Sequence, residues 1–224
     1  MTRIVSAPRD EADLMVRARA LAGRSIESLA RDWKTEIEGD PTRSKGKVGE
    51  LVERALGATG GPHRMLDFPE LRVELKTVPM GARAMPREST FVCSVSLIDA
   101  DRADWATSWV RAKLSRVLWV PIQVDPGGAR RFGQPLLWSP SAEQERGLAD
   151  DFEEIVGRVG AGAIEGLTAR TGRWLQLRPK AAHGRVRTGA PGADGEIVQT
   201  VPRGFYLRAR FTGAILREPG ACPD

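Results

Sequence analysis

The feature that most constrains the fold is a nearly continuous apolar run at residues 117–124. Such a run is typical of a β-strand that is covered on both faces, as in the middle of a sheet flanked by helices. Two further segments, 71–78 and 89–98, alternate apolar and polar residues, which predicts strands with one face toward a core. The intervening loop, 79–86, is interpreted as a hairpin-like connection. We therefore expect an α/β protein with a central mixed sheet flanked by helices.

The N-terminal part of the chain is predicted to be helical. Apolar residues at helical spacing predict helices over about residues 14–21 and 26–33. A third predicted helix, about 47–56, follows a polar, basic loop at 39–47 and carries Glu53 at the edge of its apolar stripe. A carboxylate at that edge can face a neighbouring cleft, although most helical glutamates are simply exposed to solvent.

The C-terminal part of the chain contains the clearest helix signal. Residues 140–158 begin with Ser141 and Gln144, which have the spacing of a capping box, and continue with an apolar stripe. Residues 181–200 are rich in glycine, alanine and arginine and are interpreted as a mobile surface loop. The remaining predicted elements are a short helix at 110–114 and strands at 173–177 and 205–210.

Composition narrows the classes to which the chain can belong. Its 224 residues carry 34 basic and 29 acidic side chains, and the net charge of +5 favours a polyanionic partner only weakly. No apolar run approaches the roughly 18 residues that a membrane span needs. No secretory signal is visible, so we expect a cytoplasmic protein without membrane association. Cys93 and Cys222 lie far apart, so the two cysteines and two histidines lack the spacing of a standard structural zinc site, and Cys93 is expected to be a buried thiol.

Three residues around the first alternating strand point to a specific chemistry. Alternation places Glu74 and Lys76 on one face, roughly 7 Å apart along a strand that rises about 3.3 Å per residue, and Asp67 lies at the strand's entry. Two converging carboxylates suit Mg²⁺, and a neighbouring ammonium can orient a nucleophile and offset charge at phosphorus. These are the parts of metal-assisted phosphodiester hydrolysis. The pattern is loose, and an exposed strand face with an internal ion pair is the alternative.

Ordered sequence blocks along the chain resemble the MutH family, the methyl-directed mismatch-repair endonucleases of the PD-(D/E)xK, restriction-endonuclease-like group. The resemblance spans about residues 10 to 216, which makes it far more specific than the three-residue pattern. The blocks lie at residues 21–23, 29–30, 46–49, 53, 56–58, 67–68, 73–79, 88–93, 107–108, 110–111, 113–114, 116–119, 135–140, 175–182 and 202–207.

The resemblance implies a Mg²⁺-dependent endonuclease, with Mn²⁺ able to substitute, that nicks the unmethylated strand at hemimethylated GATC sites. It implies that Asp67 and Glu74 are metal-binding carboxylates, with the Leu75 carbonyl as a further ligand. Lys76 would be the catalytic lysine. Glu53 would be an accessory carboxylate that acts on a second metal or through water. Lys113 would be a second active-site lysine near the cleaved phosphate.

The resemblance also implies a set of residues that bind double-stranded DNA. Lys180 and Tyr206 would help to read GATC, because adenine methylation alters a donor in the major groove. The other implied DNA-binding residues are Lys45, Phe91, Arg178 and Pro179. Four of the chain's six lysines (Lys45, Lys76, Lys113 and Lys180) fall on these implied site positions, whereas arginine supplies nearly all other positive charge.

The expected organisation is a single domain over residues 1–224. Its N-terminal lobe, about 1–85, would carry the carboxylates, and its C-terminal lobe, about 86–224, would carry the GATC-reading loop, with a DNA cleft between them. A monomer is expected. The family associates its C-terminal helix with regulation by MutL, but here the sequence after 211–216 breaks at 218–220, which leaves a MutL-type partner open.

Two alternative functions remain compatible with these residues. The first is a type II restriction endonuclease of the same fold, which would cut both strands at GATC or a related site. The second is a non-catalytic DNA-binding protein. The latter is disfavoured by Asp67 and Glu74, because a protein that only binds DNA has no need to place two carboxylates against phosphates.

Overall fold

The computed structural model describes residues 4–37, 41–61, 65–81, 84–168, 170–181 and 185–223, and only the backbone of residues 41–45 and 101. The chain divides into two compact units. The first combines Met1–Arg87 with Arg116–Ser139, and the second combines Glu88–Ser115 with Pro140–Asp224. Residues 116–139 follow the first part of unit 2 in the sequence but belong to unit 1. They do so because their strand at 117–124 pairs with the strand at 74–79.

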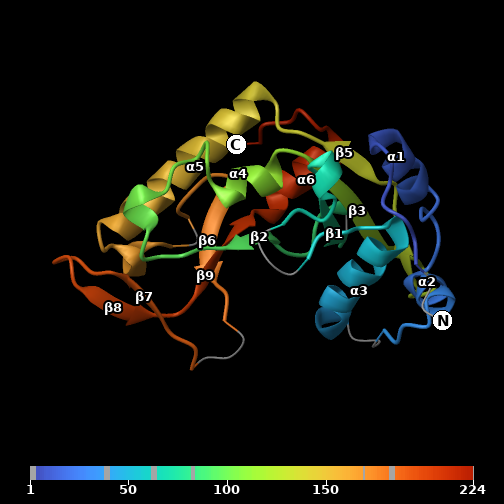
Figure 1. Cartoon of the computed structure of the whole chain (residues 1–224), viewed down its shortest axis with the longest axis horizontal. Coiled ribbons are helices and arrows are strands. Elements are labelled where there is room, and N and C mark those ends of the chain that lie inside the picture. The colour runs from blue at the N-terminus through green and yellow to red at the C-terminus, as the bar shows by residue number, and fades with distance from the viewer. Residues whose placement is uncertain are drawn as a thin grey trace. The chain divides into compact units, whose positions relative to one another are not determined.

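The first unit is a mixed four-stranded sheet with helices. Its central strand, β3, pairs in parallel with β1 and antiparallel with β4 and β5. The first six residues of β3 are buried, which confirms the strand predicted from the apolar run. The elements are α1 (Glu11–Arg19), α2 (Ile26–Asp32), α3 (Pro41–Leu56), η1 (Pro69–Leu71), β1 (Glu74–Pro79), β3 (Val117–Val124), β4 (Arg130–Phe132) and β5 (Leu136–Trp138) (Figure 1).

The third helix is longer than predicted. It begins at Pro41, so the predicted loop at 39–47 is wrong over residues 41–47, and Lys45 lies in a helix instead of a loop. Proline is favoured in the first turn of a helix, because the amide hydrogen that it lacks would have no partner there. The apolar stripe begins only at Val48, and this late start hid the first two turns from a prediction based on periodicity. Helix propensity and packing together extend the helix beyond its apolar stripe.

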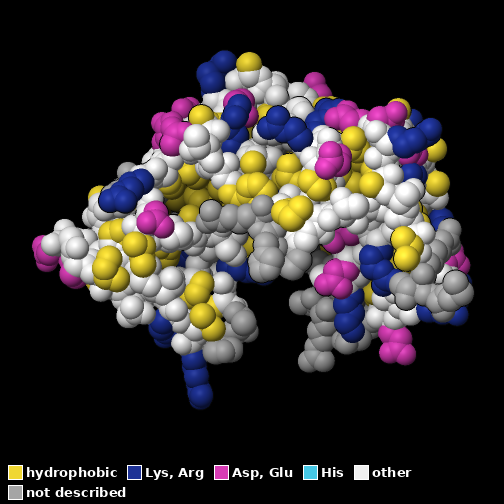
Figure 2. Space-filling model, in the orientation of Figure 1, with side chains coloured by type: hydrophobic (Ala, Val, Ile, Leu, Met, Phe, Trp, Pro, Cys, Tyr) yellow, Lys and Arg dark blue, Asp and Glu magenta, His cyan; other side chains and the backbone are white. Residues whose placement is uncertain are grey.

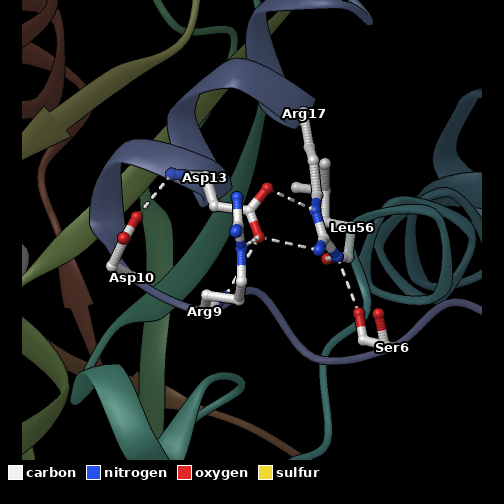
Figure 3. Close-up of polar contacts among 6 residues, drawn as sticks. All are labelled: Ser6, Arg9, Asp10, Asp13, Arg17 and Leu56. Atoms are coloured by element: carbon white, nitrogen blue, oxygen red, sulfur yellow. Dashed lines mark hydrogen bonds and ion pairs between the residues drawn. The ribbon is translucent and has the colours of Figure 1, made fainter.

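A partly buried polar cluster ties the N-terminal segment to the end of α3 (Figure 3). The Arg17 guanidinium forms two hydrogen bonds with the Asp13 carboxylate, at 3.1 and 2.8 Å. Its Nη1 also donates to the backbone oxygens of Ser6, at 2.7 Å, and Leu56, at 3.3 Å. Leu56 is the last residue of α3, whose final carbonyls have no partner within the helix. Arg17 therefore caps α3 from outside.

The second unit contains a three-stranded antiparallel sheet in the order β2-β9-β6, together with a separate β7–β8 hairpin. Helix α5 contacts β6, and its predicted capping box of Ser141 and Gln144 is confirmed. The elements are β2 (Thr90–Ser94), η3 (Ala100–Arg102), α4 (Trp109–Leu114), α5 (Ala142–Gly160), η4 (Ile164–Gly166), β6 (Leu175–Pro179), β7 (Thr188–Pro191), β8 (Ile197–Thr200), β9 (Arg203–Leu207) and α6 (Ala209–Arg217).

Two predicted connections are wrong. The segments 71–78 and 89–98 do not form a hairpin, because β1 pairs with β3 in unit 1 while β2 pairs with β9 in unit 2. The segment 181–200 is not a structureless loop, since its described part contains β7 and β8. Hydrophobic side chains cover part of this hairpin (Figure 2), where Ile197 is 56% exposed and Ile98, from the loop after β2, is 49% exposed.

The α/β class with a mixed sheet is confirmed. Cys93 is a buried cysteine, as expected. No helix in the described part of the chain combines the length and apolar character that crossing a bilayer requires.

Candidate active site and recognition surface

Asp67 reaches β1 through a tight turn of the chain. Phe68 and Val73 exchange two backbone hydrogen bonds, of 3.0 and 3.1 Å, around the short helix η1, and Arg72 adopts the left-handed conformation. This turn folds Asp67 back against the strand that follows, where its Oδ2 accepts a 2.7 Å hydrogen bond from the Leu75 backbone N–H. The Asp67 carboxylate therefore lies beside the peptide that joins Glu74 to Leu75.

Glu74 and Lys76 lie on one face of β1, as the alternation predicted, and they form an ion pair there. The Lys76 Nζ lies 2.6 Å from the Glu74 Oε1, and their side chains are 16% and 2% exposed. Leu75, between them, points into the core of unit 1 and anchors the strand. A carboxylate and an ammonium withdrawn from water in this way interact more strongly than a surface pair.

Glu53 completes a group that we call the carboxylate cluster: Glu53, Asp67, Glu74 and Lys76. Burial, followed by the negative charges of Asp67 and Glu74, raises the pKa of the Glu53 carboxyl to about 7, and Lys76 opposes this rise. The backbone fixes Glu53 as well, because its carbonyl accepts the Ala58 N–H at 2.9 Å in the turn that ends α3.

The cluster has the chemistry of a magnesium site rather than of an all-protein metal cage. Within the described ranges, no group of three or more His, Cys, Asp and Glu side chains is arranged to enclose a metal ion. Mg²⁺ commonly binds through one or two carboxylates and completes its shell with water and substrate phosphate. Asp67 and Glu74, with the mutual repulsion that raises the Glu53 pKa, fit that requirement.

Four of the predicted DNA-binding residues meet on the three-stranded sheet of unit 2. We call this group, Phe91, Arg178, Lys180 and Tyr206, the aromatic–basic face. The rings of Phe91 and Tyr206 pack edge to face with centroids 5.2 Å apart. The Lys180 ammonium lies 4.8 Å from the centre of the Phe91 ring, and the Arg178 guanidinium lies 5.4 Å from that of Tyr206. Cations at these distances are attracted to the ring faces.

The same sheet face contains two polar residues that the sequence analysis did not identify. Gln176 is 6% exposed and lies opposite Tyr206 in the β6–β9 pairing. Its Nε2 donates a 2.6 Å hydrogen bond to the Ser89 Oγ, from the segment just before β2. The available signal was weak, because a single glutamine in an apolar strand does not reveal its partner 87 residues away. The Tyr206 pKa is raised by burial and by Glu88, while Arg178 lowers it.

The remaining predicted site residues are placed less closely. Pro179 ends β6 and is exposed. Lys113, on α4, is half-buried with its ammonium 5.3 Å from the centre of the Trp109 ring, and it belongs to unit 2 rather than to the unit of the carboxylate cluster. The side chain of Lys45 lies outside the described residues.

Comparison with known proteins identifies the family. The family model described as "DNA mismatch repair enzyme MutH" matches residues 56–151. The chain is 48% identical over 212 residues to the DNA mismatch repair protein MutH of Serratia proteamaculans, an alignment that covers 93% of each chain. This chain belongs to the MutH family. MutH of Klebsiella pneumoniae is 46% identical and covers 95% of this chain and 94% of its own, and MutH of Pectobacterium atrosepticum is 45% identical with 94% and 92% covered.

Family membership makes the chain an enzyme of DNA mismatch repair. The sequence likeness covers both the carboxylate cluster and the aromatic–basic face. Asp67, Glu74 and Lys76 lie within the range that the MutH family model matches, whereas Glu53 precedes it and Tyr206 follows it. The alignments to the MutH relatives extend over more than nine-tenths of the chain, so both units are part of the likeness.

Proposed function

We propose that this chain is a Mg²⁺-dependent DNA endonuclease that nicks the unmethylated strand at hemimethylated GATC sites. The observation that carries the proposal is the buried Glu74–Lys76 ion pair, at 2.6 Å, beside the Asp67 carboxylate. Together these side chains supply one ammonium and two carboxylates, the groups that metal-assisted phosphodiester hydrolysis uses. Membership of the MutH family supplies the biological setting.

In this proposal Asp67 and Glu74 hold the cation, with the Leu75 carbonyl as a further ligand and Glu53 acting on a second cation or through water. Mg²⁺, when bound, lowers the pKa of coordinated water and neutralises phosphate charge. Mn²⁺ has similar preferences for oxygen ligands and is proposed to substitute. Burial and the negative charges of Asp67 and Glu74 raise the Glu53 pKa to about 7, and a bound cation would relieve the repulsion between the carboxylates.

Lys76 orients the attacking water and favours its deprotonated form. The water oxygen forms a bond to phosphorus while the bond from phosphorus to the 3′ oxygen breaks, and that oxygen takes up a proton. The products are a 5′-phosphate and a 3′-hydroxyl. Lys113 is proposed to stabilise the charge on the cleaved phosphate from the second unit.

The aromatic–basic face is proposed to read the site. A lysine can recognise guanine acceptors in the major groove, and an added adenine methyl can clash with a neighbouring ring. We assign Lys180 and Tyr206 to this reading, with Phe91, Arg178, Pro179 and Lys45 as further DNA contacts. Contacts between rings and cations limit the directions of four of these side chains, which a base-specific contact requires: Phe91, Arg178, Lys180 and Tyr206.

The partner of the reaction is proposed to be a MutL-type protein in the cytoplasm, acting on a monomer of this chain. The described C-terminal part is ordered against α5, because the Gln144 Nε2 donates 2.9 Å hydrogen bonds to the carbonyls of Pro219 and Ala221. Addition of purified MutL to the nicking assay should raise the rate. An unchanged rate at all MutL concentrations would remove this part of the proposal.

The test of the function uses purified protein with Mg²⁺ and unmethylated, hemimethylated and fully methylated GATC duplexes labelled on each strand. We expect nicking of unmethylated strands only and no cleavage of the fully methylated duplex. Lys76→Ala should lose cleavage while keeping most DNA binding, and Lys34→Ala, at an exposed lysine of the same unit, should behave as wild type.

Three outcomes would contradict the proposal in different ways. Absence of cleavage on every duplex would reject the enzyme and favour the non-catalytic DNA-binding protein. Concerted cutting of both strands would favour the restriction endonuclease. Cleavage by Lys76→Ala at the wild-type rate would reject the site.

A further inference from the structure

The middle strand of the three-stranded sheet contains a glycine that its backbone does not require. Gly204 lies in β9, between Ser94 of β2 and Arg178 of β6. It does not adopt the left-handed conformation that favours glycine. Glycine weakens a strand interior and there often marks the close approach of another group. The neighbouring side chains, rather than the backbone conformation, therefore explain why position 204 is a glycine.

The ring of Phe91 occupies the space above Gly204. A Cβ added to Gly204 would lie 2.8 Å from the Phe91 Cε2 and 2.9 Å from the backbone oxygen of Cys93. Real side chains do not come so close, so any other residue at position 204 must displace the ring, the neighbouring strand or both. The Phe91 ring fills the space that a side chain at position 204 would occupy, and we call this space the seat of the ring.

A shift in strand pairing directs Phe91 over this seat. The register of β2 against β9 changes between Phe91, which lies opposite Tyr206, and Cys93, which lies opposite Phe205. Such irregularities re-aim a side chain relative to the sheet. Nearby, the 2.6 Å hydrogen bond from Gln176 to Ser89 joins β6 to the start of β2 across the middle strand. This bond restricts the movement of β2 away from the sheet.

The seated ring in turn contacts both residues that are assigned to DNA reading. Its edge-to-face contact with Tyr206 has a centroid distance of 5.2 Å, and the Lys180 ammonium lies 4.8 Å from its centre. Lys180 is exposed, and its ammonium contacts the Phe91 ring. A displaced ring would release Lys180 and tilt or free Tyr206.

We propose that Gly204 is a positioning residue for DNA site recognition, because its missing side chain seats the Phe91 ring that orients Lys180 and Tyr206. This inference rests on the proposed function, in which those two residues read the site. It predicts that Gly204 controls discrimination between sites, while the cleavage chemistry of the carboxylate cluster is independent of it.

The seating itself can be tested without DNA. Tyr206 is the only tyrosine of the chain, so protein labelled in the tyrosine ring gives one set of NMR ring resonances. Gly204→Ala should shift these resonances. The matched control is Gly157→Ala in α5 of the same unit, where an added Cβ meets nothing within 4 Å, and it should leave them unchanged. Unshifted resonances in Gly204→Ala would overturn the proposal.

The effect on recognition is tested with a hemimethylated GATC duplex and the same duplex carrying one changed base pair. Gly204→Ala should lower the ratio of the two cleavage rates by about tenfold, the size of one good base contact. On a Phe91→Ala background the same substitution should change that ratio less than about twofold, because coupled sites are non-additive. Its cost in thermal stability should persist there, since the contact with the Cys93 oxygen remains. Full additivity on discrimination would overturn the proposal.

Two outcomes separate this proposal from the function on which it rests. Wild-type protein that cleaves no duplex would reject the proposed function, and the tyrosine resonances would still decide whether Gly204 seats the ring. If Gly204→Ala does not fold, Phe91→Ala is used instead, because it removes the ring without adding volume at position 204. Phe91→Ala with unshifted tyrosine resonances or with full wild-type discrimination would overturn the proposal.

Discussion

The carboxylate cluster of unit 1 and the aromatic–basic face of unit 2 are built by opposite means. The cluster gathers like charges, whose burial and repulsion raise the Glu53 pKa to about 7, and Lys76 opposes this rise. The aromatic–basic face gathers cations over ring faces, where charge and packing support each other. Carboxylates that repel one another gain stability from a bound cation, whereas cations and rings that attract one another need no further ligand. The difference suits a chemical site in the first case and a recognition surface in the second.

The largest expected effect tests the chemical half of this comparison. Asp67→Asn should lower the rate of DNA cleavage by about 10³-fold or more, because loss of a metal-binding carboxylate removes several kcal/mol of transition-state stabilisation. Binding without metal, measured by fluorescence anisotropy, should change by less than about threefold, since binding depends mainly on phosphate contacts. Asp32→Asn, at an exposed aspartate of the same unit, is the control. A loss of cleavage smaller than about tenfold would contradict the assignment.

The next effect concerns the stability of unit 2. The buried Asp151 carboxylate accepts hydrogen bonds from the backbone N–H groups of Arg173, Trp174 and Leu175, at 2.6 to 2.7 Å, at the start of β6. Asp151→Asn should lower the free energy of unfolding by about 2–4 kcal/mol, because charge-assisted bonds to buried donors are lost. Urea denaturation measures this, with Asp150→Asn, at the exposed neighbour, as the control. Equal unfolding curves for the two variants would show that the carboxylate does not organise the sheet.

A smaller effect tests the recognition half. Lys180→Ala should weaken DNA binding by about tenfold and reduce the preference for GATC, because one directed cationic contact is lost. Titrations at several salt concentrations should separate a base contact from a phosphate contact, since only the latter lowers the salt dependence by about one counterion. Arg158→Ala, on the exposed face of α5, should leave both quantities unchanged. If Lys180→Ala binds DNA more weakly but keeps the preference for GATC, Lys180 contacts a phosphate rather than a base.

The smallest effect tests the repulsion within the cluster. Glu53 has a pKa that folding raises from 4.5 to about 7, so the folded state disfavours its charged form. Wild-type stability should therefore fall as the pH rises from about 4.5 to 7 and then level off. Glu53→Gln should be more stable at pH 8 without divalent metal, by about 1 kcal/mol after allowance for solvent screening, and equally stable near pH 4.

Thermal unfolding of Glu53→Gln against Glu36→Gln, at an exposed glutamate of the same unit, measures this difference. Mg²⁺ should raise the melting temperature of wild type more than that of the variant, because its binding relieves the repulsion. A destabilised Glu53→Gln at pH 8 would contradict the comparison.

Local sequence patterns predicted the elements of this fold better than their connections. The run at 117–124 became β3, and Ser141 with Gln144 began α5, because burial on both faces and helix capping depend on residues close in sequence. The hairpin expected between 71–78 and 89–98 did not form. Each of these strands pairs with a distant segment instead, and alternation records which face is apolar but not which strand is adjacent.

The candidate site shows the same division. Alternation alone predicted that Glu74 and Lys76 share a face, and the 2.6 Å ion pair confirms that they meet. The pattern placed Asp67 only at the strand's entry, and the turn at 68–73 decides that it reaches the Leu75 backbone. The roles that the family resemblance implies for these residues stay predictions until the variants are measured.

The sequence by itself determined the α/β class, the buried centre of β3, the shared face of Glu74 and Lys76 and, through blocks over about residues 10 to 216, the MutH family. Only the tertiary structure decided that Glu53 joins the carboxylates and that Phe91 rests on Gly204 beside Tyr206 and Lys180. The physical reason is that alternation and helical periodicity act over a few residues. Contacts between distant segments depend on strand pairing and on the space that each side chain leaves for its neighbours.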